Sequence, residues 1–146
     1  MVIKSPKHEN LVWKLARKPE LVESCLTNKD VETIIPNYII TGYNGKSTDI
    51  DLVLLKKTDE LPWHPRIIAV EAKSSHNGLE KAMGELSIIG RHLAGILNDD
   101  IGTYAVFEDD GNVRSISNGR YTAPNPYIRK LSNAEIKKKL AGGVGG

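Results

Sequence analysis

The sequence predicts an α/β fold in which helices flank one mixed β-sheet, and two features carry that prediction. Residues 49–55 and 66–73 each alternate apolar side chains with other residues, as two neighbouring half-buried strands do. Residues 79–97, directly after the second strand, instead place apolar side chains at helical spacing. A helix precedes these strands and a strand follows them, so the expected order is helix, three strands, helix, strand.

The first part of the chain predicts a helix, a short second apolar segment and a strand. Ser5-Pro6 combines an N-cap with proline at the first helical position, and the helix is expected to run to about Lys18. Pro19 then opens the short apolar segment. Residues 38–41 are rich in β-forming side chains, and the glycine-containing stretch 42–47 predicts a turn.

The alternation assigns each residue of the two central strands to one face of the sheet. In the first strand an apolar face opposes one that carries both aspartates: Ile50, Leu52 and Leu54 against Asp49, Asp51 and Val53. In the second strand the face with the charged residues opposes a purely apolar one: Ile67, Ala69, Glu71 and Lys73 against Ile68, Val70 and Ala72. We therefore expect Asp51 and Glu71 to lie side by side.

The long helix and the elements after it follow from capping and turn residues. Asn77 is expected to cap the helix, and three glycines within it predict close packing on the sheet: Gly84, Gly90 and Gly95. Residues 103–107 predict a strand, and Asp110-Gly111 predicts a tight turn into residues 113–116. Ser132 to Glu135 form a capping box that opens a last, lysine-rich helix.

Composition limits the class of protein. The 146 residues suit one domain, which we place at residues 1–141, with a flexible glycine-rich tail at 142–146. A single cysteine excludes a disulfide framework and a multi-cysteine metal site. The residues Met1 to Asn10 lack the apolar run of a signal peptide, and no stretch is apolar enough to cross a membrane. We expect a soluble, cytoplasmic protein without membrane contact.

Charged residues gather where the two central strands are predicted to meet. Asp51 and Glu71, with the backbone carbonyl of Ala72, offer the hard oxygen donors that suit Mg²⁺ or Mn²⁺. Lys73 points the same way as Glu71 and would hold or activate a water molecule. A metal, a positioned water and a cation are what phosphodiester hydrolysis needs, so the pattern predicts a metal-dependent nuclease.

The Glu-x-Lys spacing alone carries little weight, since both residues are common at protein surfaces. A second copy, Glu135-Ile136-Lys137, lies on a predicted polar helix, where residues two apart point about 200° apart and cannot share a site. The first copy differs because it ends an apolar strand and follows an acidic one. The alternative for Glu71 and Lys73 is a cross-strand ion pair on a solvated sheet face.

These residues resemble the PD-(D/E)XK nuclease superfamily, also called the restriction-endonuclease-like fold. The resemblance covers roughly Glu9 to Phe107 and rests on residues 48–54, residues 68–75 and the helix from Leu79. It implies a restriction-endonuclease-like core of order αβββαβ, with a central mixed sheet flanked by helices. It also implies an endodeoxyribonuclease that uses Mg²⁺ or Mn²⁺ and leaves a 5′-phosphate on its product.

The family pattern transfers onto particular residues of this chain. The matched acid, Asp51, and Glu71 would bind the metal, and Lys73 would assist the attacking water. One departure is that Ile50, rather than proline, precedes the acid. Asp49 is therefore kept as a reserve ligand, although Asp51 is preferred because apolar residues follow it directly.

Two groups within the superfamily look closest. Archaeal-type Holliday-junction resolvases carry an early glutamate, a Gly/Ser loop and Glu-x-Lys-Ser, which Glu9, residues 45–47 and residues 71–74 resemble, although the expected arginine is missing. RecB-like nucleases carry a glutamine-leucine pair where this chain has Glu85-Leu86. Branched DNA is thus the first substrate expected, flaps, ends or specific sites are the second, and a catalytically inactive DNA-binding module is the third hypothesis.

Several further residues are candidates for the functional site, and most of them also have a purely structural interpretation. Glu9 would join the catalytic group, or serve only as an acid near a helix N-terminus. Lys46 and Ser47 would contact a DNA phosphate, or form an ordinary turn. Ser74 and His76 would contact DNA beyond the lysine, with a solvated loop histidine as the alternative for His76. The resemblance also implies a homodimer, whose surface the sequence does not identify.

Overall fold

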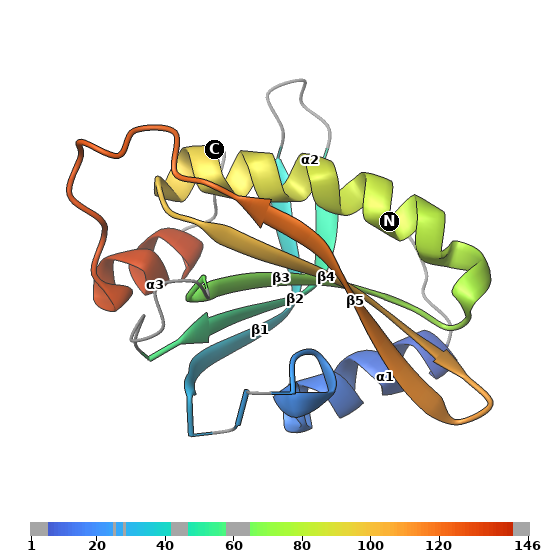
Figure 1. Ribbon diagram of the computed structural model, residues 1–146. Coiled ribbons are helices and arrows are strands. Elements are labelled where there is room, and N and C mark those ends of the chain that lie inside the picture. Colours follow the sequence, from blue (N-terminus) through green and yellow to red (C-terminus); the bar gives the residue numbers. More distant parts are fainter. Residues whose placement is uncertain (1–5, 25, 28, 42–46, 58–64, 142–146) are drawn as a thin grey trace.

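The computed structural model describes residues 6–24, 26–27, 29–41, 47–57 and 65–141, which build a mixed β-sheet with helices on both faces (Figure 1). The elements follow in the order α1 (Pro6–Arg17), η1 (Pro19–Leu21), β1 (Val31–Thr41), β2 (Ser47–Lys56), β3 (Ile67–Lys73), η2 (His76–Gly78), α2 (Leu79–Leu97), β4 (Ile101–Asp109), β5 (Asn112–Tyr121) and α3 (Asn133–Ala141). The predicted tail and the turn at 42–46 lie outside the described residues.

The five strands lie in the sheet in sequence order, β1-β2-β3-β4-β5. β1, β2 and β3 form an antiparallel meander, α2 then crosses over to bring β4 parallel to β3, and β5 returns antiparallel. This confirms an α/β fold in which helices flank a mixed sheet. β5, predicted only as a short segment, forms a full edge strand.

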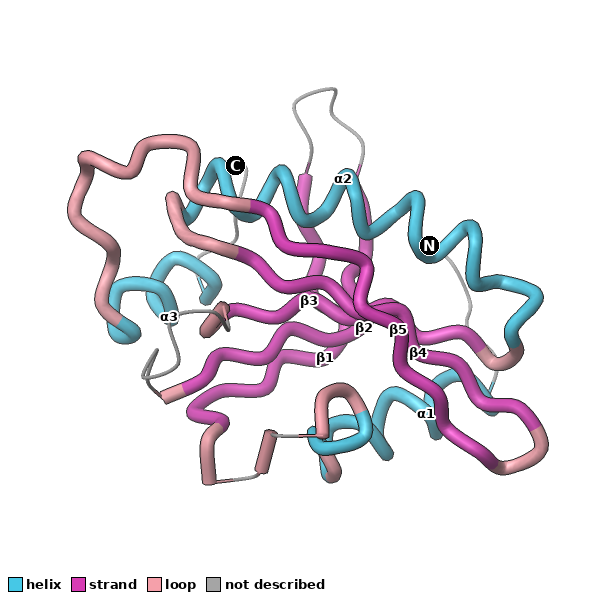
Figure 2. The backbone as a smooth tube through the Cα atoms, in the orientation of Figure 1, coloured by secondary structure: helices cyan, strands magenta, loops and turns pink. Residues whose placement is uncertain are grey.

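Two apolar cores cover the two faces of the sheet. Figure 2 shows the helices that enclose them, α2 on one side of the sheet and α1 on the other. On one face α2 and α3 pack against residues such as Val53, Ile67 and Ala69. On the other face α1 and η1 pack against residues such as Leu52 and Ile68. The alternation predicted for β3 is confirmed, since Ile67 and Ala69 belong to the α2 core and Ile68, Val70 and Ala72 to the α1 core. Glu71 and Lys73 therefore share the α2 face.

The alternation predicted for β2 is wrong at one point. Ile50 packs in the α2 core, with Val53, whereas Leu52 packs in the α1 core. The register places Asn37 of β1 opposite Asp51, and Asn37 has a left-handed backbone with φ of +52°. A left-handed residue turns the strand locally, so side chains on its two sides no longer follow one alternation. The change of face in β2 thus lies between Ile50 and Leu52, next to Asp51.

Three smaller expectations also change. Asn77 does not cap α2, because the 3₁₀ turn η2 precedes the helix and Gly78 occupies the N-cap. Of the three glycines in α2, a Cβ atom at Gly84 or Gly95 would meet nothing within 4 Å, and only Gly90 packs closely on a strand. β1 begins at Val31, well before the predicted start, so this edge strand includes Pro36. Within the described residues, none of the helices combines the length and apolarity needed to cross a membrane.

The predicted capping box of α3 is confirmed. The hydroxyl of Ser132 accepts a hydrogen bond from the backbone N–H of Glu135, and the Glu135 carboxylate accepts one from the backbone N–H of Ser132. The hydrogen bonds from Arg129 and Ser132 lower the pKa of Glu135 to about 2.

A buried ion pair between Arg66 and Asp99 lies next to the start of α3, which Arg66 also contacts. Arg66, just before β3, donates from Nε and Nη2 to Oδ2 of Asp99 at 3.0 and 2.7 Å. It also donates to the side chain of Asn133 and the carbonyl of Leu131. The Arg66 and Asp99 side chains are 11% and 3% exposed, so loss of either charge leaves the other buried.

We expect Asp99→Ala to lower the free energy of unfolding by about 3 kcal/mol, since it removes the carboxylate that the buried Arg66 guanidinium contacts. The matched control is Glu32→Ala, which removes an acid from the partly exposed pair with Lys137 and should cost less than about 1 kcal/mol. Urea unfolding followed by circular dichroism measures both. Equal values for the two variants would contradict the structural role of the pair.

Candidate active site

Asp51 and Glu71 lie at the point where β2 and β3 stop pairing. The paired residues run from Leu55 opposite Ile67 to Leu52 opposite Val70. At the next position, that of Asp51 and Glu71, side-chain carboxylates instead of backbone carbonyls accept hydrogen bonds from the backbone N–H groups. The backbone N–H of Asp51 donates to Oε1 of Glu71 at 3.3 Å, and the backbone N–H of Ala72 donates to Oδ2 of Asp51 at 2.8 Å. Each acid therefore bonds to the backbone of the opposite strand, with Glu71 on the α2 face and the Asp51 carboxylate in contact with His8 of α1.

Both carboxylates are buried, with residue exposures of 1% for Asp51 and 2% for Glu71. Burying two acids side by side is unfavourable unless hydrogen bonds, protons or cations compensate for lost hydration. The imidazole of His8, from α1, supplies one such contact, because its Nε2 lies 3.2 Å from Oδ2 of Asp51. When the Asp51 carboxylate is ionised it only accepts hydrogen bonds, and Nε2 is then the donor in that contact.

Lys73 ends β3 on the same face as Glu71, two residues further along the strand. Its Nζ lies 3.9 Å from Oε1 of Glu85 in α2, and both side chains are about a quarter to a third exposed. The aliphatic stem packs on η2, where a Cβ atom at Gly78 would lie 3.0 Å from Cγ and Cδ of Lys73. This contact constrains the stem, while the ammonium group stays accessible to water.

Two other acids of the predicted site, Glu9 and Asp49, lie on α1 and β2. The Glu9 side chain is 38% exposed, and its Oε1 lies 3.8 Å from Nδ1 of His8. His8 in turn contacts Asp51 through Nε2. Asp49 is partly exposed and lies opposite Ile39 of β1. Of the two aspartates, Asp51 is the one that bonds to β3.

The predicted DNA-contacting residues are only partly described. Ser74 follows β3 and is partly exposed. His76 is exposed, with Nδ1 at 3.1 Å from Oδ2 of Asp109 and its ring centroid 6.3 Å from that of Phe107 in a T-shaped arrangement. Lys46 lies outside the described residues, as does the side chain of Ser47. Contact with DNA stays a prediction for all four.

His8 is the site residue that the sequence interpretation missed. Zinc-type spacing between histidines is absent from the sequence, but this histidine has a different signature. It precedes Leu11, Val12 and Leu15 by three, four and seven residues, so it belongs to the buried face of α1. A histidine on the apolar face of a helix that covers an acidic strand was the available clue.

The donor set at the parted strands suits a hard divalent cation. Asp51 and Glu71 supply carboxylate oxygens, and residues of an antiparallel strand point their N–H and C=O to the same side, so the Ala72 carbonyl faces β2 as its N–H does. Oxygen donors of this kind favour Mg²⁺ or Mn²⁺ over softer metals. Across the described part of the chain, no three His, Cys, Asp or Glu side chains are grouped as a ready-made metal site, so this set depends on the backbone carbonyl and water.

Comparisons with protein-family models, with curated proteins and with solved structures find no match to this chain.

Proposed function

We propose that this protein is a metal-dependent endodeoxyribonuclease of the PD-(D/E)XK type. The observation that carries the proposal is the reciprocal bonding of Asp51 and Glu71 where β2 and β3 part, with Lys73 on the same face as Glu71. A purely structural ion pair between strands would set Lys73 against one of these acids. The contact recorded for its ammonium group is instead with Glu85 of α2.

The order of elements also supports the proposal. α1, the meander β1-β2-β3, the crossover α2 and the parallel strand β4 correspond to the αβββαβ order that the family resemblance implies. In that arrangement the matched acid lies on the second strand and the Glu-x-Lys on the third, as Asp51 and Glu71 do here.

The residues divide the work of hydrolysis as follows. Asp51, Glu71 and the carbonyl of Ala72 would hold Mg²⁺ or Mn²⁺. A bound cation of this class supplies a nucleophile near neutral pH and stabilises the charge that develops on the phosphate oxygens. Lys73 orients the attacking water with its ammonium group and adds positive charge beside the phosphate. His8 fixes the Asp51 carboxylate by donating to Oδ2, which leaves the orientation of that side chain set before substrate binds.

The proposal is tested by incubating the protein with a four-way junction, a flap and a linear duplex in Mg²⁺, in Mn²⁺ and in chelator. We expect cleavage that requires the divalent cation, and products with 5′-phosphate ends. Preference for the junction supports the resolvase-like assignment, and preference for the flap or the duplex supports a RecB-like or restriction-type enzyme. Absence of cleavage of every DNA with either cation would contradict the proposal and favour an inactive DNA-binding module.

A further inference from the structure

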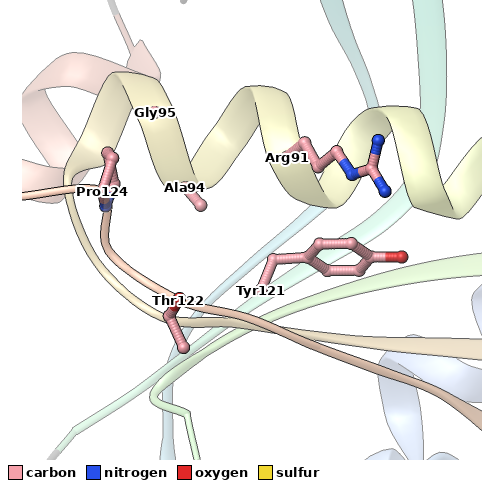
Figure 3. Close-up of a pocket in the computed structure, with 6 residues that line it drawn as sticks. All are labelled: Arg91, Ala94, Gly95, Tyr121, Thr122 and Pro124. Carbon is pink, nitrogen blue, oxygen red and sulfur yellow. The ribbon is translucent and has the colours of Figure 1, made fainter.

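A second feature lies away from the two acids, in a cavity of about 300 Å³ between α2 and the end of β5 (Figure 3). Its lining combines a guanidinium group, an aromatic ring, a hydroxyl group and small apolar groups: Arg91, Ala94, Gly95, Tyr121, Thr122 and Pro124. Figure 3 shows the Tyr121 ring alongside α2, with its hydroxyl and the Arg91 guanidinium pointing the same way. The cavity therefore offers a flat ring and a positive charge together.

The position of the Tyr121 ring depends on a glycine. A Cβ atom at Gly90 would lie 2.4 and 2.6 Å from Cδ2 and Cε2 of Tyr121, which no real side chain tolerates. The absence of a side chain at this helical position lets the ring lie directly against α2, next to Arg91. Glycine costs about 1 kcal/mol relative to alanine inside a helix, so this close approach has a measurable cost.

Arg91 also differs from the nearby arginines in its partners. Arg120 pairs with Asp100, and Arg66 pairs with Asp99. Arg91 is exposed, and no carboxylate of the described residues is recorded in an ion pair with it. A guanidinium group that lines a cavity and is paired with no carboxylate in the described ranges is available to bind an anion such as phosphate.

The cavity and the candidate active site lie on the same face of the sheet but at opposite ends of its strands. Tyr121 pairs with Ile101, which pairs with Ile67 at the start of β3. Glu71 lies four residues further along β3 and two strands away from β5, about 13 Å along the strands and about 10 Å across them, or about 16 Å in all. One strand of B-form DNA advances about 3.4 Å per phosphate, so about five nucleotides cover that distance.

We propose that this cavity binds an unpaired nucleotide, with its base stacked on Tyr121 and its phosphate on Arg91. Stacking on an aromatic ring beside an arginine is how proteins hold single-stranded nucleic acid with little sequence preference. The choice of ligand rests on the proposed function, because a nuclease that acts near junctions or flaps meets unpaired strands. The same chemistry would also take a free mononucleotide.

The test measures binding in chelator, without cleavage, of a labelled single-stranded oligothymidylate by fluorescence anisotropy and of thymidine monophosphate by calorimetry. We expect Arg91→Gln and Tyr121→Leu each to weaken oligothymidylate binding about tenfold. The matched controls are Lys81→Gln, an exposed cation on the same helix, and Tyr127→Leu, a tyrosine 96% exposed and outside the cavity. Both controls should change the affinity less than about twofold.

Two results would overturn the proposal. Equal weakening by Arg91→Gln and Lys81→Gln would show a general effect of positive charge. Unchanged binding in Arg91→Gln would contradict the contact between Arg91 and the phosphate. Because the Arg91 side chain is exposed, its replacement is not expected to unfold the helix. Tight binding of the mononucleotide with the same variant pattern, but not of the oligonucleotide, would assign the cavity to a free nucleotide and overturn the strand assignment. Because the assay excludes divalent cations, a failure of the nuclease proposal appears separately, as absent cleavage with intact binding.

Discussion

Asp51→Asn is expected to lower the rate of DNA cleavage by at least about 10²-fold. The substitution keeps the size of the side chain but removes the charge that would hold the cation. It also places an amide where Oδ2 now accepts hydrogen bonds from Ala72 and His8, so one of those donors can face another donor. Single-turnover cleavage in Mg²⁺, on whichever substrate the wild-type protein cleaves best, measures the loss.

Asp49→Asn is the matched control, because it makes the same chemical change two residues earlier on β2. Asp49 is partly exposed, whereas Asp51 is buried and bonds to β3. We expect Asp49→Asn to retain the wild-type rate within about threefold, since a side chain outside the charge-stabilising group contributes little to the transition state. The reverse pattern would make Asp49 the metal ligand and contradict the assignment of Asp51.

Lys73→Met is expected to lower the cleavage rate by about 10²-fold while DNA affinity stays near that of the wild type. Methionine keeps an unbranched stem against Gly78, so packing is preserved and the loss comes from the ammonium group. An effect on the rate without an effect on binding is typical of a group that acts mainly in the transition state. Cleavage rate and anisotropy-based affinity, measured on the same preparation, separate the two.

The second Glu-x-Lys copy supplies the control for this variant. Lys137 lies on α3, where it pairs with Glu32 on the protein surface. Lys137→Met makes the same substitution in the same short pattern, and we expect the cleavage rate to stay near the wild-type value. A comparable loss in both variants would mean that overall positive charge, rather than the position of Lys73, supports activity.

Most of the fold could be predicted because the apolar periodicity of the chain is regular. The alternation in residues 66–73 identified β3 and its faces, and the helical spacing in residues 79–97 identified α2. The face of Ile50 could not be predicted this way, because the left-handed Asn37 lies on the neighbouring strand. A pattern along one strand carries no information about a distortion that its partner imposes.

In the candidate site too, local patterns predicted some residues and long-range packing positions others. Glu71 and Lys73 share one face as predicted because β3 is regular. The alternation of β2 fails at Asp51, whose backbone N–H bonds to Glu71 while its carboxylate contacts His8 of α1. His8 could not be placed at Asp51 from the sequence, since the contact spans 43 residues and depends on how α1 crosses the sheet. Long-range packing of this kind is outside what local spacing can indicate.

The most direct test of a cation between Asp51 and Glu71 is a crystal grown in Mn²⁺ and examined by anomalous diffraction. We predict an anomalous peak in the gap between β2 and β3, in direct contact with a carboxylate oxygen of each residue. A map with full density for both side chains and no peak between them, or with Mn²⁺ bound only elsewhere, would contradict the cation site.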